Sequence, residues 1–385
     1  MARCARRLTE RRHPLTTASR DAATHAARDT DRYLWPAEGY LNKNMTRDNI
    51  DRLIDEVGLV QAGAQCCVAA ILFTYRCSIR CRHCLFGSAP DRPEVVMTSR
   101  QCADGLGLLH ETGRVVHIAG GEAMLYWEVL SEAVRLAGEE GNAPHFIETN
   151  CSFATDDRRV RERLGFFAAH GVKGLLASAD AFHQEFVPAE HFLRVRRIAK
   201  EVFGEKNFWG TDNSEAEVRD FESITGDDGR LREYVRSHPP SIVGRAQREL
   251  SQYLDHYAPG DSELPKWGWK GPAREAHCMR QFRADTMWEL HIDPYGNIQT
   301  NCGMILGKLP EASPAAVLAK GPEKANRFVS IVCERGPWGL ADLASREYGF
   351  VLPEGVTQTC ELCYLTRSFL RQFHPHVFGP QEVYG

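Results

Sequence analysis

The stretch CVAAILFTYRCSIRCRHCLFGS (Cys67–Ser88) joins an apolar run to a loop that carries three more cysteines. The run Cys67–Phe73 has the length and composition of a buried strand. Cys77, Cys81 and Cys84 follow it with the spacing C-x3-C-x2-C. A closed zinc site needs four ligands. Either a fourth ligand therefore lies elsewhere in the chain, or the site is built to stay open.

The composition is that of a globular protein without a strong charge bias. The chain has 385 residues and a formal charge of -4 at pH 7. This length accommodates one large α/β domain and a smaller appendage. The charge offers no broad basic face, so we expect no nucleic-acid partner. No apolar run approaches the roughly 18 residues of a membrane span, and we recognise no signal peptide, so we expect no membrane contact and a cytoplasmic location.

The chain is rich in cysteine, with 13 in total. The number is odd and nothing in the sequence suggests export, so a disulfide framework is not expected. Clustered thiols in a reducing compartment indicate metal or redox chemistry.

The N-terminal segment, residues 1–44, is rich in Arg, Ala and Thr and shows little hydrophobic periodicity, so we expect it to be disordered. Its Arg-rich, acid-poor start is typical of a transit peptide, but translation from an upstream start codon before Met45 is the favoured explanation. Residues 45–66 are expected to form a helical lead-in, with Thr46 as the N-cap of a helix that runs to about Val57.

Strand-like and helix-like segments alternate from residue 67 to about residue 250. The expected strands are 67–73, 114–118, 145–149 and 174–178, with a late strand at 241–246. The expected helices are 98–111, 124–140, 156–170 and 190–203. This alternation predicts right-handed β-α units around a parallel sheet, and at this length a full or partial barrel over residues 67–275.

The last third of the chain has a different pattern. Residues 287–302 alternate between apolar and polar around a Pro-Tyr-Gly-Asn turn, which predicts a β-hairpin. We therefore expect a small separate module over residues 276–385.

The three-cysteine loop can hold three irons of a 4Fe–4S cluster and leave the fourth iron without a protein ligand. On this pattern the chain resembles the radical S-adenosylmethionine (SAM) superfamily. The resemblance implies a partial (β/α)6 barrel in which Cys77, Cys81 and Cys84 bind the cluster and the open iron binds SAM. It also implies that the reduced cluster cleaves SAM to a 5′-deoxyadenosyl radical, which removes hydrogen from a substrate C–H bond. From the residues alone, a zinc loop or an incidental group of cysteines is the alternative.

Further motifs support the resemblance at the expected strand ends. Gly120, Gly121 and Glu122 resemble the GGE motif of the superfamily, which holds the SAM amino group. Glycines permit close backbone approach, and a carboxylate complements an ammonium group. Asn150 lies in ETNCS, which resembles a stretch near the SAM ribose and methionine, although Cys151 stands where the family usually has glycine.

Three more features fit the family in part. Ser178 and Asp180 resemble the residues that face the ribose or the substrate from the next strand end. His83 occupies the position before the third cysteine, where the family usually has an aromatic residue near the adenine, and an imidazole can also stack or hydrogen-bond there. The GRA triplet, Gly244–Ala246, resembles a late-barrel motif, but Arg245 is explained equally well as a surface charge.

A second set of cysteines lies near the C-terminus. Cys278, Cys302, Cys360 and Cys363 resemble the twitch or SPASM-type extension of some radical SAM enzymes, which implies an auxiliary 4Fe–4S cluster with Gly296 as the turn glycine. The one-cluster twitch form is the better match, because no cysteine follows Cys363.

A four-cysteine zinc site is the alternative for this set, and Cys333 is a spare candidate ligand. The remaining cysteines, Cys4, Cys66, Cys67 and Cys102, are interpreted as core or tail residues, because free cysteine packs as a small hydrophobe.

Two clusters would favour a net oxidation, in which the substrate radical loses an electron to the auxiliary cluster and a dehydrogenated or crosslinked peptide or small molecule results. The alternative is epimerisation of a sugar, aminocyclitol or peptide residue with a cysteine hydrogen donor, for which Cys151 is the candidate and a packed thiol the simpler explanation. His183 and Glu185 are candidates for substrate contact, but each is better explained as a loop residue with a structural partner.

A non-catalytic metal-binding scaffold is the remaining class of function. It would retain the cysteines without needing Glu122, Asn150 and Ser178 at successive strand ends, so their co-occurrence favours an enzyme. A flavodoxin- or ferredoxin-type protein is the expected electron donor.

Overall fold

The computed structural model describes residues 45–259, 264–265, 278, 282–284 and 286–385. The described residues all belong to one compact unit. The expectations for residues 1–44, Cys4 included, lie outside the described residues.

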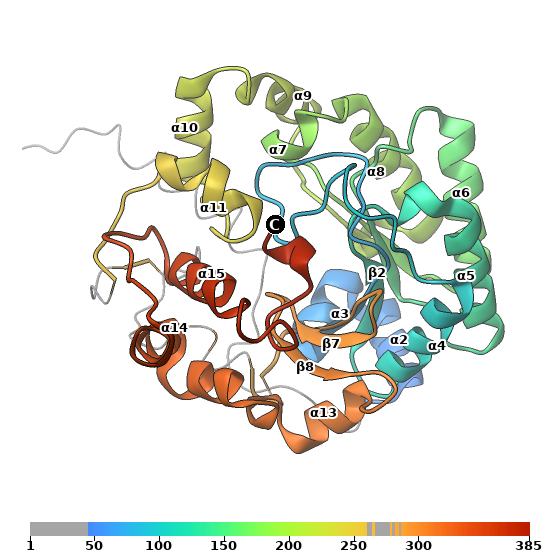
Figure 1. Ribbon diagram of the computed structural model, residues 1–385. Helices are drawn as coiled ribbons and strands as arrows, with labels where there is room; N and C mark the ends of the chain where they lie inside the picture. The colour runs from blue at the N-terminus through green and yellow to red at the C-terminus, as the bar shows by residue number, and fades with distance from the viewer. Residues whose placement is uncertain (1–44, 260–263, 266–277, 279–281, 285) are drawn as a thin grey trace, which may run out of the picture. The chain divides into compact units, whose positions relative to one another are not determined.

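The described strands form one mixed sheet. They are β1 (Val68–Leu72), β2 (Val115–Ala119), β3 (Phe146–Thr149), β4 (Gly174–Ala177), β5 (Phe208–Trp209), β6 (Glu289–Ile292), β7 (Asn297–Thr300) and β8 (Ile305–Lys308). Their order is β5-β4-β3-β2-β1-β6-β7-β8. Figure 1 labels β2, β7 and β8 of this sheet. Neighbouring strands are parallel from β5 to β6 and antiparallel from β6 to β8. The fold is therefore mixed α/β with a sheet dominated by parallel strands.

Helices precede, separate and follow the strands. The longer ones are α2 (Arg47–Val57), α3 (Leu59–Cys66), α4 (Ser99–His110), α5 (Trp127–Glu139), α6 (Asp157–Ala169), α8 (Ala189–Phe203), α9 (Glu215–Ile224), α10 (Asp228–Ser237), α14 (Arg327–Tyr348) and α15 (Thr359–Leu370). The shorter ones include α7 (Ala181–Gln184), α11 (Arg245–Glu249) and α13 (Pro314–Lys320). The four strands and four helices expected between residues 67 and 203 are all confirmed within a few residues, except that the first turn of the second helix is a 3-10 helix, Ala123–Tyr126.

The late strand expected at 241–246 is wrong. Residues 241–243 have no regular structure, and helix α11 begins at Arg245. Pro239 and Pro240 precede this segment and have no backbone N–H for a ladder. Gly244 then takes φ +56°, which ends the extended conformation.

Local signals at helix starts and at the hairpin are confirmed. The Thr46 hydroxyl accepts a hydrogen bond from the backbone N–H of Asn49 and caps α2. Strands β6 and β7 form the expected hairpin, with Leu290 opposite Thr300. The same β6 pairs in parallel with β1, so the hairpin extends the sheet of the β-α units. The domain boundary near residue 276 stays a prediction.

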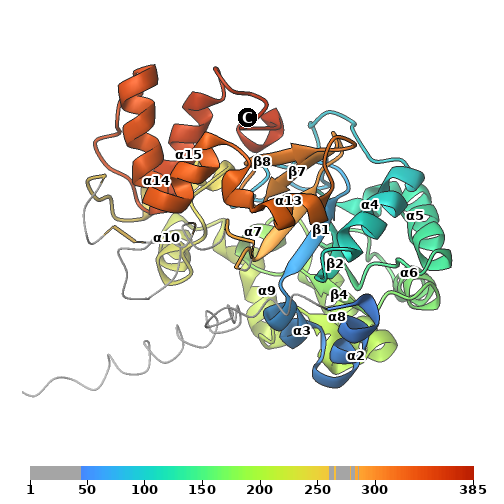
Figure 2. The same ribbon diagram turned by 90° about the horizontal axis from the view of Figure 1, so that it is seen from below.

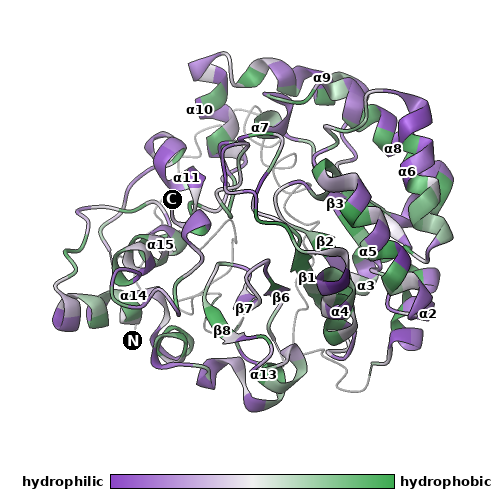
Figure 3. Ribbon diagram, turned by 45° about the vertical axis from the view of Figure 1, so that its right-hand side comes forward, coloured by the Kyte–Doolittle hydropathy of each residue, from purple (hydrophilic) through white to green (hydrophobic). Residues whose placement is uncertain are grey.

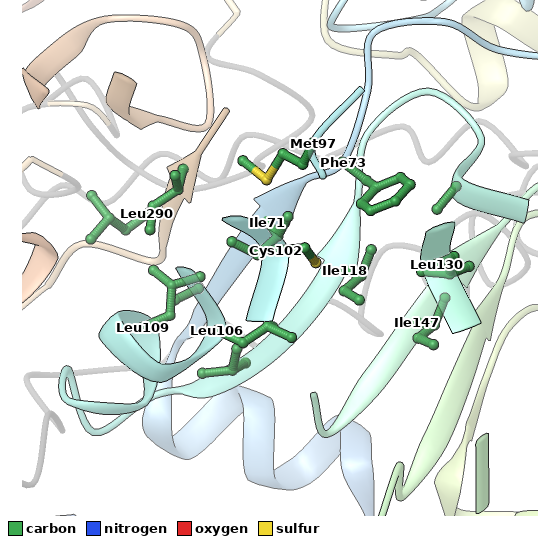
Figure 4. Packing of buried hydrophobic residues seen from close by; sticks show 14 of the residues in the cluster. Ile71, Phe73, Met97, Cys102, Leu106, Leu109, Ile118, Leu130, Ile147 and Leu290 are labelled. Carbon is green, nitrogen blue, oxygen red and sulfur yellow. The ribbon is translucent and has the colours of Figure 1, made fainter. Parts of the chain in front are cut away.

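The outer face of the sheet packs on amphipathic helices. Side chains at alternate strand positions, such as Ile71, Ile118 and Ile147, form one hydrophobic cluster with residues of α4 and α5 (Figure 4). The helices α4, α5, α6 and α8 carry both hydrophobic and hydrophilic segments (Figure 3), as expected for helices with one buried face. Cys102 is fully buried in this cluster, as expected of a core residue.

The opposite face, called the inner face below, carries the other strand residues in layers. At the amino ends of the strands, Val68 and Phe146 pack on Ile54 of α2 and Leu59 of α3. Figure 2 shows α2 and α3 at this end of β1. Cys66 belongs to the same cluster, and it and Cys67 are buried as expected. At the carboxyl ends, Leu72 and Ala119 form a second apolar layer with Tyr75 and Val383. The loops that follow these carboxyl ends carry the motifs singled out from the sequence.

Within the described part of the chain, no helix has both the length and the apolar content that a bilayer crossing requires.

Candidate functional site

The three-cysteine loop follows strand β1 and lies at the carboxyl edge of the sheet. Cys77 and Cys81 are buried, and Cys84 is half-buried. The thiols of Cys81 and Cys84 are hydrogen-bonded to each other. The backbone N–H of Ser88 donates to Sγ of Cys84 at 3.3 Å. The loop therefore gathers its thiols in one place, as the spacing predicts.

The environment of the loop favours a thiolate at Cys84. The hydrogen bond with Cys81 lowers the pKa of the Cys84 thiol to about 6; burial opposes this effect, and the Arg245 guanidinium adds to it. The same hydrogen bond, together with burial, raises the pKa of Cys81. Burial raises the pKa of Cys77 to about 12. Iron binding requires all three thiols to lose their protons, so loading of the site releases protons.

Arg245 is a buried clamp on the cysteine loop. Its side chain is 2% exposed, so the surface-charge interpretation is wrong. Nη1 donates to the carbonyl oxygen of Cys81 at 2.7 Å, and Nη2 donates to those of Gly87 at 2.9 Å and Ser88 at 2.7 Å. The backbone N–H of Arg245 donates to the carbonyl of Cys84 at 3.1 Å. One side chain thus fixes the loop and places a positive charge beside its thiols.

Two glycine positions let the surrounding backbone reach the same loop. A Cβ on Gly121 would lie 1.9 Å from the carbonyl oxygen of Arg76, and a Cβ on Gly244 would lie 2.5 Å from that of Cys84. The backbone N–H of Gly121 donates to the carbonyl of Thr74 at 2.7 Å. The close approach expected of the GGE glycines is therefore made to the cysteine loop itself. A contact of Gly120 and Gly121 with SAM stays a prediction.

Glu122 and Asn150 come together at the ends of β2 and β3. The Glu122 carboxylate is buried and accepts hydrogen bonds from the backbone N–H of Asn150 at 2.7 Å, the hydroxyl of Thr149 at 3.0 Å and the backbone N–H of Met124 at 3.2 Å. Burial raises the pKa of Glu122 to about 7, against the effect of these hydrogen bonds. The carboxylate is fixed in position beside the cysteine loop, where it can meet a cation.

The side chain of Asn150 links β3 to the cysteine loop. Its Nδ2 donates to Sγ of Cys77 at 3.4 Å and to the hydroxyl of Ser78 at 3.0 Å. The hydroxyls of Ser78 and Ser152 are 2.7 Å apart. The backbone N–H of Ser178 donates to the carbonyl of Thr149, which sets the end of β4 beside this group. Contacts to a thiolate from outside the ligand set orient it and adjust its basicity.

His83, Asp180 and His183 form a compact group on the other side of the loop. His183 Nδ1 lies 2.8 Å from Asp180 Oδ2, and His83 Nε2 lies 3.4 Å from the same oxygen. The His83 ring packs on Phe182, with centroids 4.8 Å apart. Burial lowers the pKa of His83 to about 4, whereas in Asp180 the two imidazoles outweigh burial and lower the pKa of the carboxyl. His183 has the structural partner expected of it.

One ligand atom from each of these three side chains lies within 4.8 Å of the others, a spacing that a metal ion can bridge. Asp180 already accepts the backbone N–H groups of Phe182 and His183 as the N-cap of α7. Glu185, the other loop candidate, receives two nitrogens of the Arg82 guanidinium, each at 2.9 Å. It too has a structural partner.

The four C-terminal cysteines lie near one another, although they come from separate parts of the chain. Cys302 follows β7, and Cys360 and Cys363 lie on α15. Burial and then the thiols of Cys363, Cys360 and Cys302 raise the pKa of Cys278. Burial and the neighbouring thiols raise the pKa of Cys360 to about 12. Cys333 is buried in the hydrophobic cluster beside the outer face of the sheet.

Arg367 holds this second set of thiols, and the sequence analysis missed it. It is buried one turn after Cys363 on α15, hydrogen-bonds to the Cys363 thiol and donates through Nη1 to the carbonyl of Cys302. The i, i+4 spacing from Cys363 places both side chains on one face of the helix. That spacing was the available signal.

In neither set do the thiols lie as close together as the ligands of a bound zinc ion. Among the described residues, no three of these thiols have their sulfur atoms within 4.8 Å of one another. A tetrahedral zinc site with Zn–S bonds of about 2.3 Å holds its four sulfurs within about 4 Å of one another. A 4Fe–4S cluster binds each thiolate through a different iron and so needs more widely spaced thiols. The three thiols gathered in the first loop fit a 4Fe–4S cluster with one open iron. What the C-terminal thiols hold stays a prediction.

Cys151 lies apart from the inner face. It is fully buried in the hydrophobic cluster between the sheet and its helices, has φ +66°, and burial raises the pKa of its thiol. This environment favours the packed-thiol interpretation. The role of hydrogen donor stays a prediction.

The C-terminal segment, Gln381–Gly385, lies between the two sets of thiols. Val383 packs on Leu72 and Ala119 at the carboxyl ends of β1 and β2. The Tyr384 ring stacks on Tyr364 of α15 at a centroid distance of 5.6 Å.

Guanidinium groups hydrogen-bond to two residues of the C-terminal segment, Tyr384 and Gly385. Arg367 Nη1 donates to the Tyr384 hydroxyl at 2.8 Å. Arg92 and Arg248 donate to the carbonyl oxygen of Gly385 at 2.8 and 3.2 Å. Figure 1 marks the end of the chain close to α11 and α15.

A surface cleft of about 1080 Å³ lies elsewhere, along β7, β8 and the C-terminal segment. Its lining includes Arg92, Tyr295, Lys308, Arg371 and Glu382. None of the thiols lines it. We therefore place the candidate site at the two sets of thiols and not in this cleft.

Comparison with known proteins agrees with the geometry of the cysteine loop. Residues 71–205 match the family model of the Radical SAM superfamily. This segment, about a third of the chain, is thus similar to the domain of enzymes that use a 4Fe–4S cluster and SAM. It spans Cys77, Cys81, Cys84, Glu122 and Asn150. No curated protein matches the chain.

Seven chains among solved structures match. One comes from the crystal structure of BtrN in complex with AdoMet and 2-DOIA. It has 13% sequence identity and a TM-score of 0.38, over 71% of this chain and 88% of that chain.

Proposed function

We propose that the protein is a radical SAM oxidoreductase that converts a peptide or small molecule to a dehydrogenated or crosslinked product, with a second 4Fe–4S cluster as electron acceptor. Cys77, Cys81 and Cys84 would hold the first cluster. Cys278, Cys302, Cys360 and Cys363 would hold the second. When bound, the first cluster and SAM supply a 5′-deoxyadenosyl radical that removes a hydrogen atom from the substrate.

The observation that carries the oxidation is the convergence of four thiols from three distant segments. Burial and the neighbouring thiols of the set raise the pKa of Cys278 and of Cys360, and the effect of the neighbours requires the fold to bring these thiols together. A second cluster gives the electron of a substrate radical a destination. Since Cys151 is enclosed by apolar side chains, no observation of equal weight favours epimerisation.

The residues of this chain have distinct tasks in the proposed reaction. Glu122, held by three hydrogen bonds, presents a carboxylate for the SAM amino group. His83 offers a neutral ring for the adenine, because burial keeps its pKa near 4. Arg245 fixes the loop that carries the thiols, and Asn150 orients Cys77. The apolar layer of Leu72 and Val383 limits the access of water.

Iron content and EPR spectra of the anaerobically reconstituted protein test the two-cluster proposal. We expect about eight irons per chain in the parent protein and about four in a variant with Cys77, Cys81 and Cys84 changed to Ala. About four irons in the parent and none in the variant would leave the oxidation without its electron acceptor. The C-terminal thiols would then need a zinc or structural explanation.

The radical chemistry has its own test. The parent protein, reduced anaerobically with SAM, is expected to form 5′-deoxyadenosine, and Cys81→Ala is expected to form none. Formation by the variant at the parent rate would overturn the assignment of the cluster loop. Reaction in deuterated water separates the two outcomes for substrate, because solvent deuterium on a stable carbon of the product, lost in Cys151→Ala, indicates epimerisation.

A further inference from the structure

A belt of charged side chains crosses the inner face of the sheet, between its two apolar layers. Ala70 of β1 is in register with His117 of β2 on one side and His291 of β6 on the other. Glu148 of β3 and Glu289 of β6 complete the belt. These four charged or titratable side chains, His117, Glu148, Glu289 and His291, are called the inner belt below.

The inner belt is a continuous chain of ionic contacts. Nδ1 of His117 lies 3.1 Å from a carboxylate oxygen of Glu148, and its Nε2 lies 3.2 Å from a carboxylate oxygen of Glu289. Nε2 of His291 lies 2.9 Å from that same oxygen of Glu289. The small side chain of Ala70 leaves the space in which these contacts meet.

The belt is enclosed on its imidazole side and accessible on its carboxylate side. The side chains of His117 and His291 are 1% exposed, whereas those of Glu148 and Glu289 are 34% and 20% exposed. Burial of charged groups carries a desolvation penalty, and apolar residues of similar size would often be at least as stabilising. A charged belt between apolar layers is therefore a candidate for function and not for stability.

The belt adjoins the cofactor side of the sheet. His117 lies two residues before Ala119, about 7 Å along the strand, and Ala119 leads into the GGE motif. Glu148 directly precedes Thr149 and Asn150. Phe86 of the cysteine loop packs on His291, with ring centroids 5.6 Å apart. A ligand held by the carboxylates would thus lie beside the residues assigned to SAM.

The accessible side of the belt is negative. His117 is shared between two carboxylates, and these outweigh burial and raise its pKa to about 9. Arg114, buried at the start of β2, also acts on Glu289, but its Nη1 donates to the backbone carbonyl of Met287. Glu148 lies at the open end of the belt, farthest from Arg114 along the chain of contacts.

We propose that the inner belt is the recognition site for the ammonium group of a small amine substrate, with Glu148 and Glu289 as hydrogen-bond acceptors. An ammonium group has three donors and a positive charge, which match two accessible carboxylates. This inference rests on the proposed function, because it places a substrate beside the SAM site.

A matched pair of probes tests the proposal on the reconstituted enzyme. Cyclohexylamine and cyclohexanol share one ring and differ in an ammonium against a hydroxyl group, and their affinities can be measured by ligand-observed NMR at pH 7. We expect the amine to bind at least about tenfold more tightly than the alcohol, because hydrogen bonds to charged groups are the stronger ones.

Three variants locate the binding. Glu148→Gln and Glu289→Gln remove one charge each with little change of shape and are each expected to weaken amine binding about tenfold. Glu132→Gln, on the exposed face of α5, is the control and should leave the affinity unchanged. Glu148→Gln is the decisive variant if Glu289→Gln fails to fold, since Glu148 is the more exposed of the two.

The inference is overturned if the amine binds no better than the alcohol, if neither probe binds, or if the folded Glu148→Gln variant binds the amine as the parent does. Formation of 5′-deoxyadenosine, measured on the same preparation, separates this failure from that of the proposed function. SAM cleavage without amine binding would refute only the proposal that the inner belt binds an ammonium group. Amine binding without SAM cleavage would refute the radical SAM assignment alone.

Discussion

The two sets of thiols are assembled in opposite ways. Cys77, Cys81 and Cys84 lie within one short loop, which a buried arginine and two glycine contacts fix to its surroundings. Cys278, Cys302 and the cysteines of α15 come from segments more than twenty residues apart. The first set is thus determined by local backbone hydrogen bonds, and the second by the packing of the whole C-terminal region.

The pKa values of the thiols also differ between the two sets. In the first loop the hydrogen bond with Cys81 lowers the pKa of Cys84 to about 6 and the Arg245 guanidinium adds to this effect, whereas the pKa values of Cys77 and Cys81 are raised. In the second set burial and neighbouring thiols raise the pKa of Cys278, and that of Cys360 to about 12. A preorganised loop can take up iron without refolding, whereas thiols that repel one another as thiolates gain their stability from the metal.

The largest effect expected from this difference is at Arg245. Arg245→Ala leaves three loop carbonyls without their donor and removes the charge beside Cys84, so we expect SAM cleavage to fall about 100-fold or more. Arg245→Lys should not restore SAM cleavage, because the single ammonium group of Lys cannot reproduce the planar guanidinium that donates to three carbonyl oxygens. Arg158→Ala, at an 81% exposed side chain, is the control, measured as 5′-deoxyadenosine formed per minute. Near-parent activity in Arg245→Ala would mean that the cysteine loop keeps its conformation without the Arg245 side chain.

A backbone test of the same loop is Gly121→Ala. The added Cβ would lie 1.9 Å from the carbonyl oxygen of Arg76, so the loop or the GGE segment must move. We expect a loss of about 2–3 kcal/mol in the free energy of unfolding, measured by denaturant titration. Gly165→Ala in α6 is the matched control, since nothing lies within 4 Å of its added Cβ, and it should stabilise slightly. Equal stabilities for the two variants would contradict the close approach.

Removal of iron should separate the two regions directly. With a chelator under anaerobic conditions, we expect the backbone amides of α15 (Thr359–Leu370) to exchange hydrogen at least about tenfold faster, because metal binding there contributes to folding. The amides of β1 (Val68–Leu72), enclosed in the sheet, should change little. Hydrogen exchange followed by mass spectrometry measures both segments in one sample. Equal acceleration of the two segments would mean that both regions depend on iron for their stability.

The smallest effect is expected at Arg367. Arg367→Lys retains the positive charge but loses part of the contact with the carbonyl of Cys302 and the hydroxyl of Tyr384. We expect iron to leave the C-terminal site about threefold faster under a chelator, followed by the decay of its EPR signal. Arg346→Lys on α14 is the exposed control. No difference between the two variants would show that charge alone is enough at this position.

The sequence was sufficient for the elements that depend on local pattern. The apolar run Cys67–Phe73 became β1, and the alternation in 287–302 became the hairpin, because burial and turn geometry are encoded within a few residues. The segment 241–246 failed because two prolines and a glycine outweigh its apolar character. The three thiols of the first loop were also readable from spacing alone.

Contacts between distant residues could not be predicted in this way. Arg245 donates hydrogen bonds to carbonyl oxygens more than 150 residues earlier in the chain. No local sequence pattern indicates that this arginine is buried. Two residues of the inner belt could have been recognised from the sequence. His117 in VVHIA and Glu148 in FIET are titratable residues within largely apolar strands, at positions that alternate with the residues of the buried outer face. Such residues in a parallel strand are candidates for the inside of the sheet.

The position of the C-terminal segment has a practical consequence for the design of expression vectors. Val383 lies against the sheet, and the carbonyl of Gly385 is held by Arg92 and Arg248 beside the cysteine loop. A purification tag fused after Gly385 would begin inside this contact and compete with it. Cluster loading measured on such a fusion would then report the tag as well as the protein, so a cleavable tag placed elsewhere is the safer choice.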